Sequence, residues 1–80
     1  MTITVKLFAT FRDFSPKEAL NATFEAEVGE PETVQGLLNV LSLPEDLPRI
    51  VLVNGRQATE DSSLSAGDTV SIFPPLIGGH

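Results

Sequence analysis

The sequence of 80 residues predicts an α+β fold, in which one main helix lies across one face of a mixed sheet of about five strands. Two observations carry this prediction. Apolar and polar residues alternate in several short segments, whereas apolar residues recur at helical spacing in one segment near the middle of the chain. Turn-forming residues separate these segments, so each is predicted to be one element of a single small domain.

The first two elements are predicted to be strands joined by a long loop. Residues 3–11 alternate, and the apolar face of this segment is formed by Ile3, Val5, Leu7 and Ala9. Turn formers at residues 13–17 end the alternation. A second alternation begins at Thr23 and stops at Gly29, with Phe24, Ala26 and Val28 on its apolar side. The two strands are therefore expected to form a hairpin.

A single helix is predicted to follow. Thr33 is the expected N-cap because its hydroxyl can accept a hydrogen bond from a backbone amide of the first turn. The apolar residues recur at helical spacing, so they form one stripe that faces the sheet: Val34, Leu37, Leu38 and Leu41. Pro44 lies beyond the expected end of the helix.

The second half of the chain is predicted to add three strands. Residues 49–53 form an apolar run after Arg49, as expected of a strand covered by the helix. Asn54-Gly55 is a strong signal for a two-residue hairpin turn, with residues 56–58 as the short returning strand. Leu64 is an isolated apolar anchor in a polar loop. The last strand, residues 69–73, directs Val70 and Ile72 into the core.

This order of elements predicts the β-grasp arrangement, with the first and last strands paired in parallel at the sheet centre. Residues 1–73 are expected to form the β-grasp domain, and residues 74–80 an extended flexible C-terminal tail. Pro74-Pro75 favours an extended path, and Gly78 and Gly79 carry no Cβ that would obstruct a partner. At the rise of a polyproline helix, residues 74–79 could reach roughly 19 Å from the domain.

Composition excludes several classes of function. The chain has no cysteine, so it brings no disulfide, thiolate metal site or nucleophilic thiol. Its net charge of −6 disfavours a nucleic-acid ligand and favours a protein partner with a basic surface. No apolar run is long enough to span a membrane, and a cytoplasmic protein is expected. No metal site, permanently bound cofactor or catalytic group is predicted, so no activity is expected of the chain alone.

Two aromatic side chains are predicted to lie outside the core. If Val5 and Leu7 are buried, Phe8 points away from the core, and if Val70 and Ile72 are buried, Phe73 does so too. A pair of exposed rings beside the tail favours a protein interface. The alternative is that Phe8 packs under the loop around Phe14.

With these features the chain resembles the ubiquitin-like sulfur carriers of the MoaD/ThiS family, most closely the small subunit of molybdopterin synthase. The resemblance spans the whole length. It rests on Val5-Lys6-Leu7-Phe8-Ala9 with Arg12, Thr33-Val34 with Leu37-Leu38, Val53-Asn54, Leu64 with Gly67-Asp68, and Phe73-Pro74-Pro75 leading to Gly78-Gly79. It implies that Phe8, Gln57 and Phe73 contact the activating enzyme, although the position of Gln57 is often apolar in the family.

The resemblance also implies the chemistry. The C-terminal carboxylate of Gly79 would be adenylated with ATP by an E1-like adenylyltransferase of the MoeB/ThiF type, and sulfur from a sulfide or persulfide would then replace AMP to give a thiocarboxylate. A MoaE-type large subunit would transfer this sulfur to a pterin precursor in the biosynthesis of the molybdenum or tungsten cofactor. The tail that threads into these partners is formed by Pro74, Pro75, Leu76, Ile77 and Gly78.

His80 departs from the family pattern, because it leaves Gly79 with an amide in place of a free carboxylate. Two explanations stay open: a protease removes His80 first, or His80 is the start of a purification tag. Alternatives to the molybdopterin pathway also stay open. These are a ThiS-type carrier for thiamine or another sulfur metabolite, and a ubiquitin-like binding module that carries no sulfur.

Overall fold

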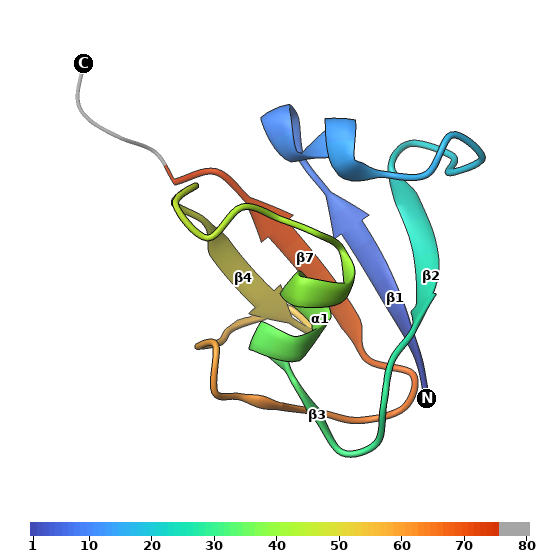
Figure 1. Cartoon of the computed structure of the whole chain (residues 1–80), viewed down its shortest axis with the longest axis vertical. Coiled ribbons are helices and arrows are strands. Elements are labelled where there is room, and N and C mark those ends of the chain that lie inside the picture. The colour runs from blue at the N-terminus through green and yellow to red at the C-terminus, as the bar shows by residue number, and fades with distance from the viewer. Residues whose placement is uncertain (76–80) are drawn as a thin grey trace.

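The main sheet has the strand order β2-β1-β7-β4-β5, and the computed structural model describes residues 1–75 of the chain (Figure 1). The strands are β1 (Thr2–Leu7), β2 (Thr23–Glu27), β4 (Ile50–Val53), β5 (Arg56–Gln57) and β7 (Thr69–Phe73). The pairing of β1 with β7 is parallel and the other pairings are antiparallel. The predicted β-grasp fold, with the first and last strands together at the centre, is confirmed.

Helix α1 (Val34–Val40) crosses one face of this sheet (Figure 1). The predicted N-cap is confirmed, because the Thr33 hydroxyl accepts a hydrogen bond of 3.3 Å from the Gly36 amide. Of the predicted stripe, Val34, Leu37 and Leu38 are completely buried. They complete a core whose other buried members are Ile3, Val5, Leu7, Phe11, Ala22, Ala26, Val28, Leu43, Val51, Leu64, Val70 and Ile72.

The chain also forms a small two-stranded sheet that the alternation did not predict. It pairs β3 (Glu32–Thr33) with β6 (Ser63–Leu64) in antiparallel register. Two residues are too few to show a period, so no local pattern could indicate these strands. Leu64 is the buried anchor that the sequence predicted, and its pairing holds the long segment after β5 against the start of α1.

The first strand is shorter than predicted. It ends at Leu7, and residues Ala9–Phe14 form the 3₁₀ helix η1. Ala9 has a φ of 55°, which takes the backbone out of the extended region. The prediction that Ala9 faces the core is therefore wrong, since Ala9 is exposed. The turn instead brings the large Phe11 ring into the core, where it closes the end of the sheet.

The predicted Asn54-Gly55 turn is confirmed. Both residues have positive φ, 53° and 85°, as the tight hairpin turn between β4 and β5 requires. The Asn54 side chain also joins this turn to the start of β7. Its Nδ2 donates to Asp68 Oδ1 at 2.9 Å, and its Oδ1 accepts from the Thr69 amide at 2.9 Å.

Candidate functional site

The face of the main sheet opposite α1 is the candidate site, and we call it the open face. Successive residues of a strand point to opposite faces, so the burial of Val5, Leu7, Val51, Val70 and Ile72 places their neighbours on this side. Directly paired residues share a face, so the residues of β2 and β5 that pair with these neighbours also lie on the open face. The open face comprises Thr4, Lys6, Phe8, Thr23, Glu25, Ile50, Leu52, Gln57, Thr69, Ser71 and Phe73.

Phe8 and Phe73 stack on each other at one end of the open face. Their ring centroids are 4.2 Å apart and the rings are inclined by 13°. The backbone sets this contact, because the Phe8 amide donates to the Ile72 carbonyl and so continues the parallel register beyond Leu7. Phe8 is still 38% exposed. The predicted outward direction of both rings is confirmed, and the alternative in which Phe8 packs under the loop around Phe14 is not observed.

A hollow of about 560 Å³ lies beside this aromatic pair. Its lining is apolar and consists of Phe8, Ala9, Ile50, Phe73, Pro74 and Pro75. Ile50 is paired directly with Phe73 across the strands, so β4 supplies the side of the hollow opposite Phe8. Since Pro74 and Pro75 belong to the lining, the hollow lies where the chain leaves the last strand. An apolar partner side chain could therefore be bound at the root of the C-terminal segment.

Arg49 binds the backbone of the loop that leads from α1 into β4. Its Nη2 donates to the carbonyls of Pro44 and Glu45, at 3.0 and 2.8 Å, and its Nε donates to the carbonyl of Leu47 at 3.1 Å. The guanidinium group thus satisfies three backbone acceptors of the loop that follows α1. This arrangement orders the loop and brings Ile50 into register with Phe73.

Gln57 belongs to a second row of the open face. This row crosses all five strands through the paired residues Thr23, Lys6, Ser71, Leu52 and Gln57. The structure therefore brings Phe8, Phe73 and Gln57 to one face. Gln57 lies on the outermost strand, with Leu52 between it and β7, whereas the two rings touch. The roles of these residues in partner contact stay predictions.

Ile50 and Leu52 are site residues that sequence reasoning missed. The run of apolar residues in 49–53 is continuous, so the sequence alone did not show which residues face the core. Their outward direction follows once Val51 is known to be buried. The remaining residues of the predicted tail, Leu76, Ile77, Gly78, Gly79 and His80, lie outside the described residues, as does the predicted reaction centre at Gly79.

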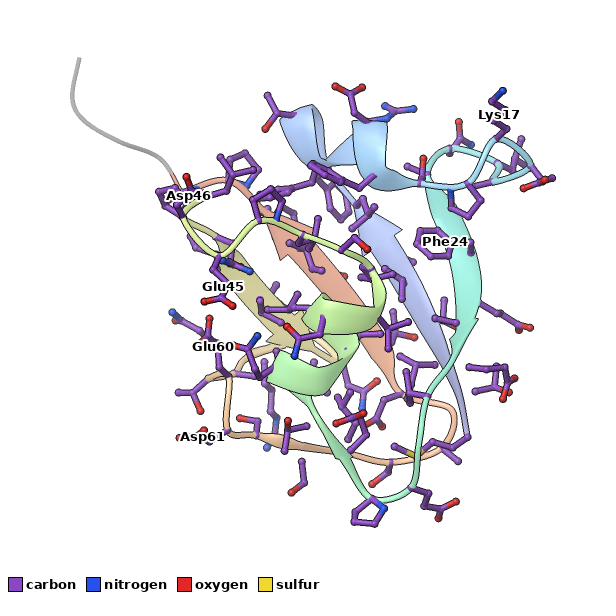
Figure 2. The ribbon with its side chains drawn as sticks, viewed as in Figure 1. Lys17, Phe24, Glu45, Asp46, Glu60 and Asp61 are labelled. Carbon is purple, nitrogen blue, oxygen red and sulfur yellow. The ribbon has the colours of Figure 1, made fainter. Side chains whose placement is uncertain are left out.

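Four exposed acidic side chains lie on the β4 side of the molecule. Figure 2 shows Glu45, Asp46, Glu60 and Asp61 along this flank, whereas Lys17 lies beyond β2 on the opposite side. The whole chain has 11 acidic and 5 basic residues. A negative field of this kind attracts a partner with a positive surface and raises the rate of encounter.

Within residues 1–75 the acidic residues form no group of three or more that could hold a metal ion. The helices of this described part are also too short to cross a lipid bilayer. The open face presents partly exposed apolar and aromatic side chains beside the root of the C-terminal segment.

The model of the ThiS family matches residues 5–79 of the chain. Among solved structures, the chain is similar to the HVO 2177 protein of Haloferax volcanii, with 31% identity, a TM-score of 0.76 and coverage of 99% of this chain and 87% of that one. It is also similar to a protein of Pyrococcus furiosus described as a putative molybdopterin converting factor, subunit 1. Here the identity is 28%, the TM-score 0.75, and the coverage 94% and 98%.

A third similar structure is the complex of subunits 1 and 2 of the molybdopterin-converting factor from Helicobacter pylori. It matches with 22% identity, a TM-score of 0.63 and coverage of 99% of this chain and 100% of that one, and this likeness concerns the fold. No curated protein matches the chain.

Proposed function

The chain belongs to the ThiS family of ubiquitin-like sulfur carriers, and we propose that it carries sulfur as a thiocarboxylate on Gly79. The resemblance drawn from the sequence is thereby confirmed at the level of the family. One observation carries the proposal: the family match extends through the tail to Gly79 and leaves out His80. The apolar hollow at Pro74 and Pro75 supports it, because it provides a docking surface at the root of that tail.

The proposed activation takes place in an E1-like adenylyltransferase of the MoeB/ThiF type. The Gly79 carboxylate, which is ionised at neutral pH, attacks the α-phosphate of ATP and releases pyrophosphate. Hydrosulfide then attacks the carbonyl carbon of the acyl adenylate. A carbon–sulfur bond forms, the carbon–oxygen bond to AMP breaks, and AMP leaves. ATP belongs to the enzyme, and the carrier itself holds no cofactor permanently.

The body of the carrier supplies binding energy and position. The aromatic pair and the hollow would bind the adenylyltransferase while the tail of residues 74–79 extends toward its nucleotide. Remote contacts of this kind lower the entropic cost of bringing the Gly79 carboxylate to the phosphate. The activation step consumes ATP, a nucleotide of the cytoplasm, so we place the protein in the cytoplasm.

For the sulfur acceptor, we propose a pterin precursor in molybdenum or tungsten cofactor biosynthesis, with a MoaE-type large subunit as the second partner. The similarity to the putative molybdopterin converting factor, subunit 1, of Pyrococcus furiosus supports this choice. The similarity in fold to one component of the Helicobacter pylori complex is consistent with it. A thiamine precursor is the alternative acceptor.

His80 requires one additional step. We propose that a protease cleaves the Gly79–His80 bond before activation, because an amide at Gly79 has no carboxylate oxygen to attack ATP. If His80 is instead the start of a purification tag, the natural chain needs no cleavage. Mass spectrometry of the protein isolated from its own cells distinguishes the two.

The test compares a chain ending at Gly79 with the full chain. Each is incubated with ATP, the cognate adenylyltransferase and sulfide, and its intact mass is measured. The chain ending at Gly79 is expected to gain the mass of one oxygen-to-sulfur exchange, while the full chain stays unchanged. No exchange on the shorter chain overturns the proposal. The product is then given to the large subunit with a pterin precursor or a thiamine precursor, and the acceptor that gains sulfur identifies the pathway.

A further inference from the structure

We propose that Lys6 pairs with an acidic side chain of the adenylyltransferase and thereby sets the orientation in which the carrier docks. This inference rests on the proposed function. It concerns the second row of the open face, where Lys6 lies between Thr23 and Ser71 in the cross-strand register. Both neighbours are uncharged, and Lys6 is exposed.

Lys6 differs from the other basic residues in or next to the strands of the main sheet in the face on which it lies. Strands β1, β2, β4, β5 and β7 carry two cations, Lys6 and Arg56. Arg56 is paired with Val53 and therefore shares the face of the sheet that α1 covers. Arg49, which precedes β4, has its guanidinium group bound to three loop carbonyls. Lys6 is thus the cation that the strands of the main sheet present on the open face.

A partner that covers the aromatic pair also covers Lys6. Lys6 and Phe8 are two residues apart on the same face, which corresponds to about 6.6 Å along a strand. A specific interface of ordinary size buries about 800 Å² of each partner, far more than one ring and its neighbours. Docking centred on the Phe8–Phe73 stack therefore takes the Lys6 ammonium group out of bulk water.

An ammonium group in an interface must be paired, because an unpaired buried charge is strongly unfavourable. The chain itself offers no counter-charge in this row, since its members are Thr23, Ser71, Leu52 and Gln57. Glu25 lies on the edge strand, paired with Thr4 rather than with Lys6. Glu25 is a diagonal neighbour of Lys6 on this face and is itself exposed, so we place a further carboxylate, from the partner, against Lys6.

The adenylyltransferase fits this chemistry. An enzyme that binds ATP and a carboxylate carries cations in its cleft, and these attract a carrier of net charge −6. General attraction brings the two proteins together without fixing their rotation. One acidic group of the enzyme placed against Lys6, the single cation of the open face, fixes the rotation. A rotated complex would instead set Lys6 against the cationic surface of the enzyme.

The test uses two charge reversals, Lys6→Glu and Lys17→Glu, in the chain ending at Gly79. Both change the net charge from −6 to −8 and so alter the long-range field equally. Lys17 lies in the loop before β2 (Figure 2). We measure kcat/KM for pyrophosphate release and, without ATP, the affinity for the cognate adenylyltransferase, each at low and high salt.

Lys6→Glu is expected to lower both quantities about 100-fold, and Lys17→Glu less than about threefold. Lys6→Met, which keeps the apolar stem of the side chain, is expected to lower them about tenfold. The excess effect at Lys6 should persist at high salt, because a pair enclosed in an interface is screened less than an exposed charge.

Equal effects of the two reversals, or tighter binding by Lys6→Met, overturn the inference even if the natural chain is adenylated normally. Binding without adenylation overturns the proposed function alone, provided that Lys6→Glu weakens binding more than Lys17→Glu does. If the natural chain does not bind the enzyme, both fail. Circular dichroism of each variant shows that it is folded.

Discussion

Phe8 lies flat against Phe73, with ring centroids 4.2 Å apart, so the ends of the first and last strands form one aromatic platform. Offset stacking of this kind contributes about 0.5–1.5 kcal/mol beyond the area that is buried. The platform is nevertheless open to solvent on one side, because Phe8 is 38% exposed. Its larger contribution is therefore expected in the complex with a partner.

Truncation of either ring should weaken docking far more than folding. Phe8→Ala and Phe73→Ala are each expected to lower kcat/KM for adenylation roughly tenfold or more, since aromatic anchors at the centre of an interface dominate its binding energy. The matched control is Leu20→Ala, which removes a side chain that is 78% exposed and does not line the hollow. If Leu20→Ala reduces the rate as much as the two ring truncations do, the open face is not the docking surface.

The Asn54 side chain should stabilise the fold by joining the β4–β5 turn to β7. Asn54→Gly keeps a residue that tolerates the observed φ of 53° but removes both side-chain hydrogen bonds. The free energy of unfolding in urea is expected to fall by about 1–2 kcal/mol. Asp68→Ala and the double variant complete a cycle, and strictly additive effects would show that the 2.9 Å bond between Asn54 and Asp68 contributes nothing.

The effect of alanine at position 36 should depend on Glu32. A Cβ on Gly36 would clash with Glu32 Oε1, and that same oxygen accepts a hydrogen bond of 2.8 Å from the Thr33 amide. In the natural chain, Gly36→Ala must displace this carboxylate, which offsets the gain in helix propensity. In a Glu32→Ala background the gain of about 0.5–1 kcal/mol should be realised in full. Thermal unfolding of the four chains measures the difference, and an equal effect of Gly36→Ala in both backgrounds would refute it.

Stiffness at the root of the tail should assist activation. Replacement of both Pro74 and Pro75 by glycine frees the backbone where the chain passes the hollow, so more conformational entropy is lost when the tail binds. KM for adenylation of the chain ending at Gly79 is expected to rise about fivefold, with kcat nearly unchanged. Pro16→Gly, in an exposed loop, serves as the control for a general effect of losing proline. A KM equal to that of the natural chain would exclude a role for stiffness.

The predictions from sequence were most accurate where a residue's surroundings follow from its nearest neighbours. The alternation placed Val5, Leu7, Val70 and Ile72 in the core and turned Phe8 and Phe73 outward. The Thr33 cap depends on local backbone geometry, and it was predicted correctly for the same reason. The turn at Asn54-Gly55 is a third such feature.

The errors lie where distant segments compete. The alternation predicted that β1 continues beyond Leu7. In the fold the strand ends there, and the 3₁₀ helix that follows buries Phe11 and leaves Ala9 exposed. The pairing of β3 with β6 joins segments far apart in the chain and leaves no periodic trace. The sequence left open whether Ile50 and Leu52 face the core, and the burial of Val51 shows that they lie on the opposite face.

The sequence by itself determined which side chains share a face within each strand, because the backbone of an extended strand alternates by geometry alone. It also determined the family to which the residues leading to Gly79 belong. The tertiary structure decided which strands are neighbours and in what register, since these depend on packing between segments distant in the chain. Because of that register, Phe8 stacks on Phe73 and Gln57 lies on the same face. For the same reason, Lys6 is the cation that the strands of the main sheet present on the open face.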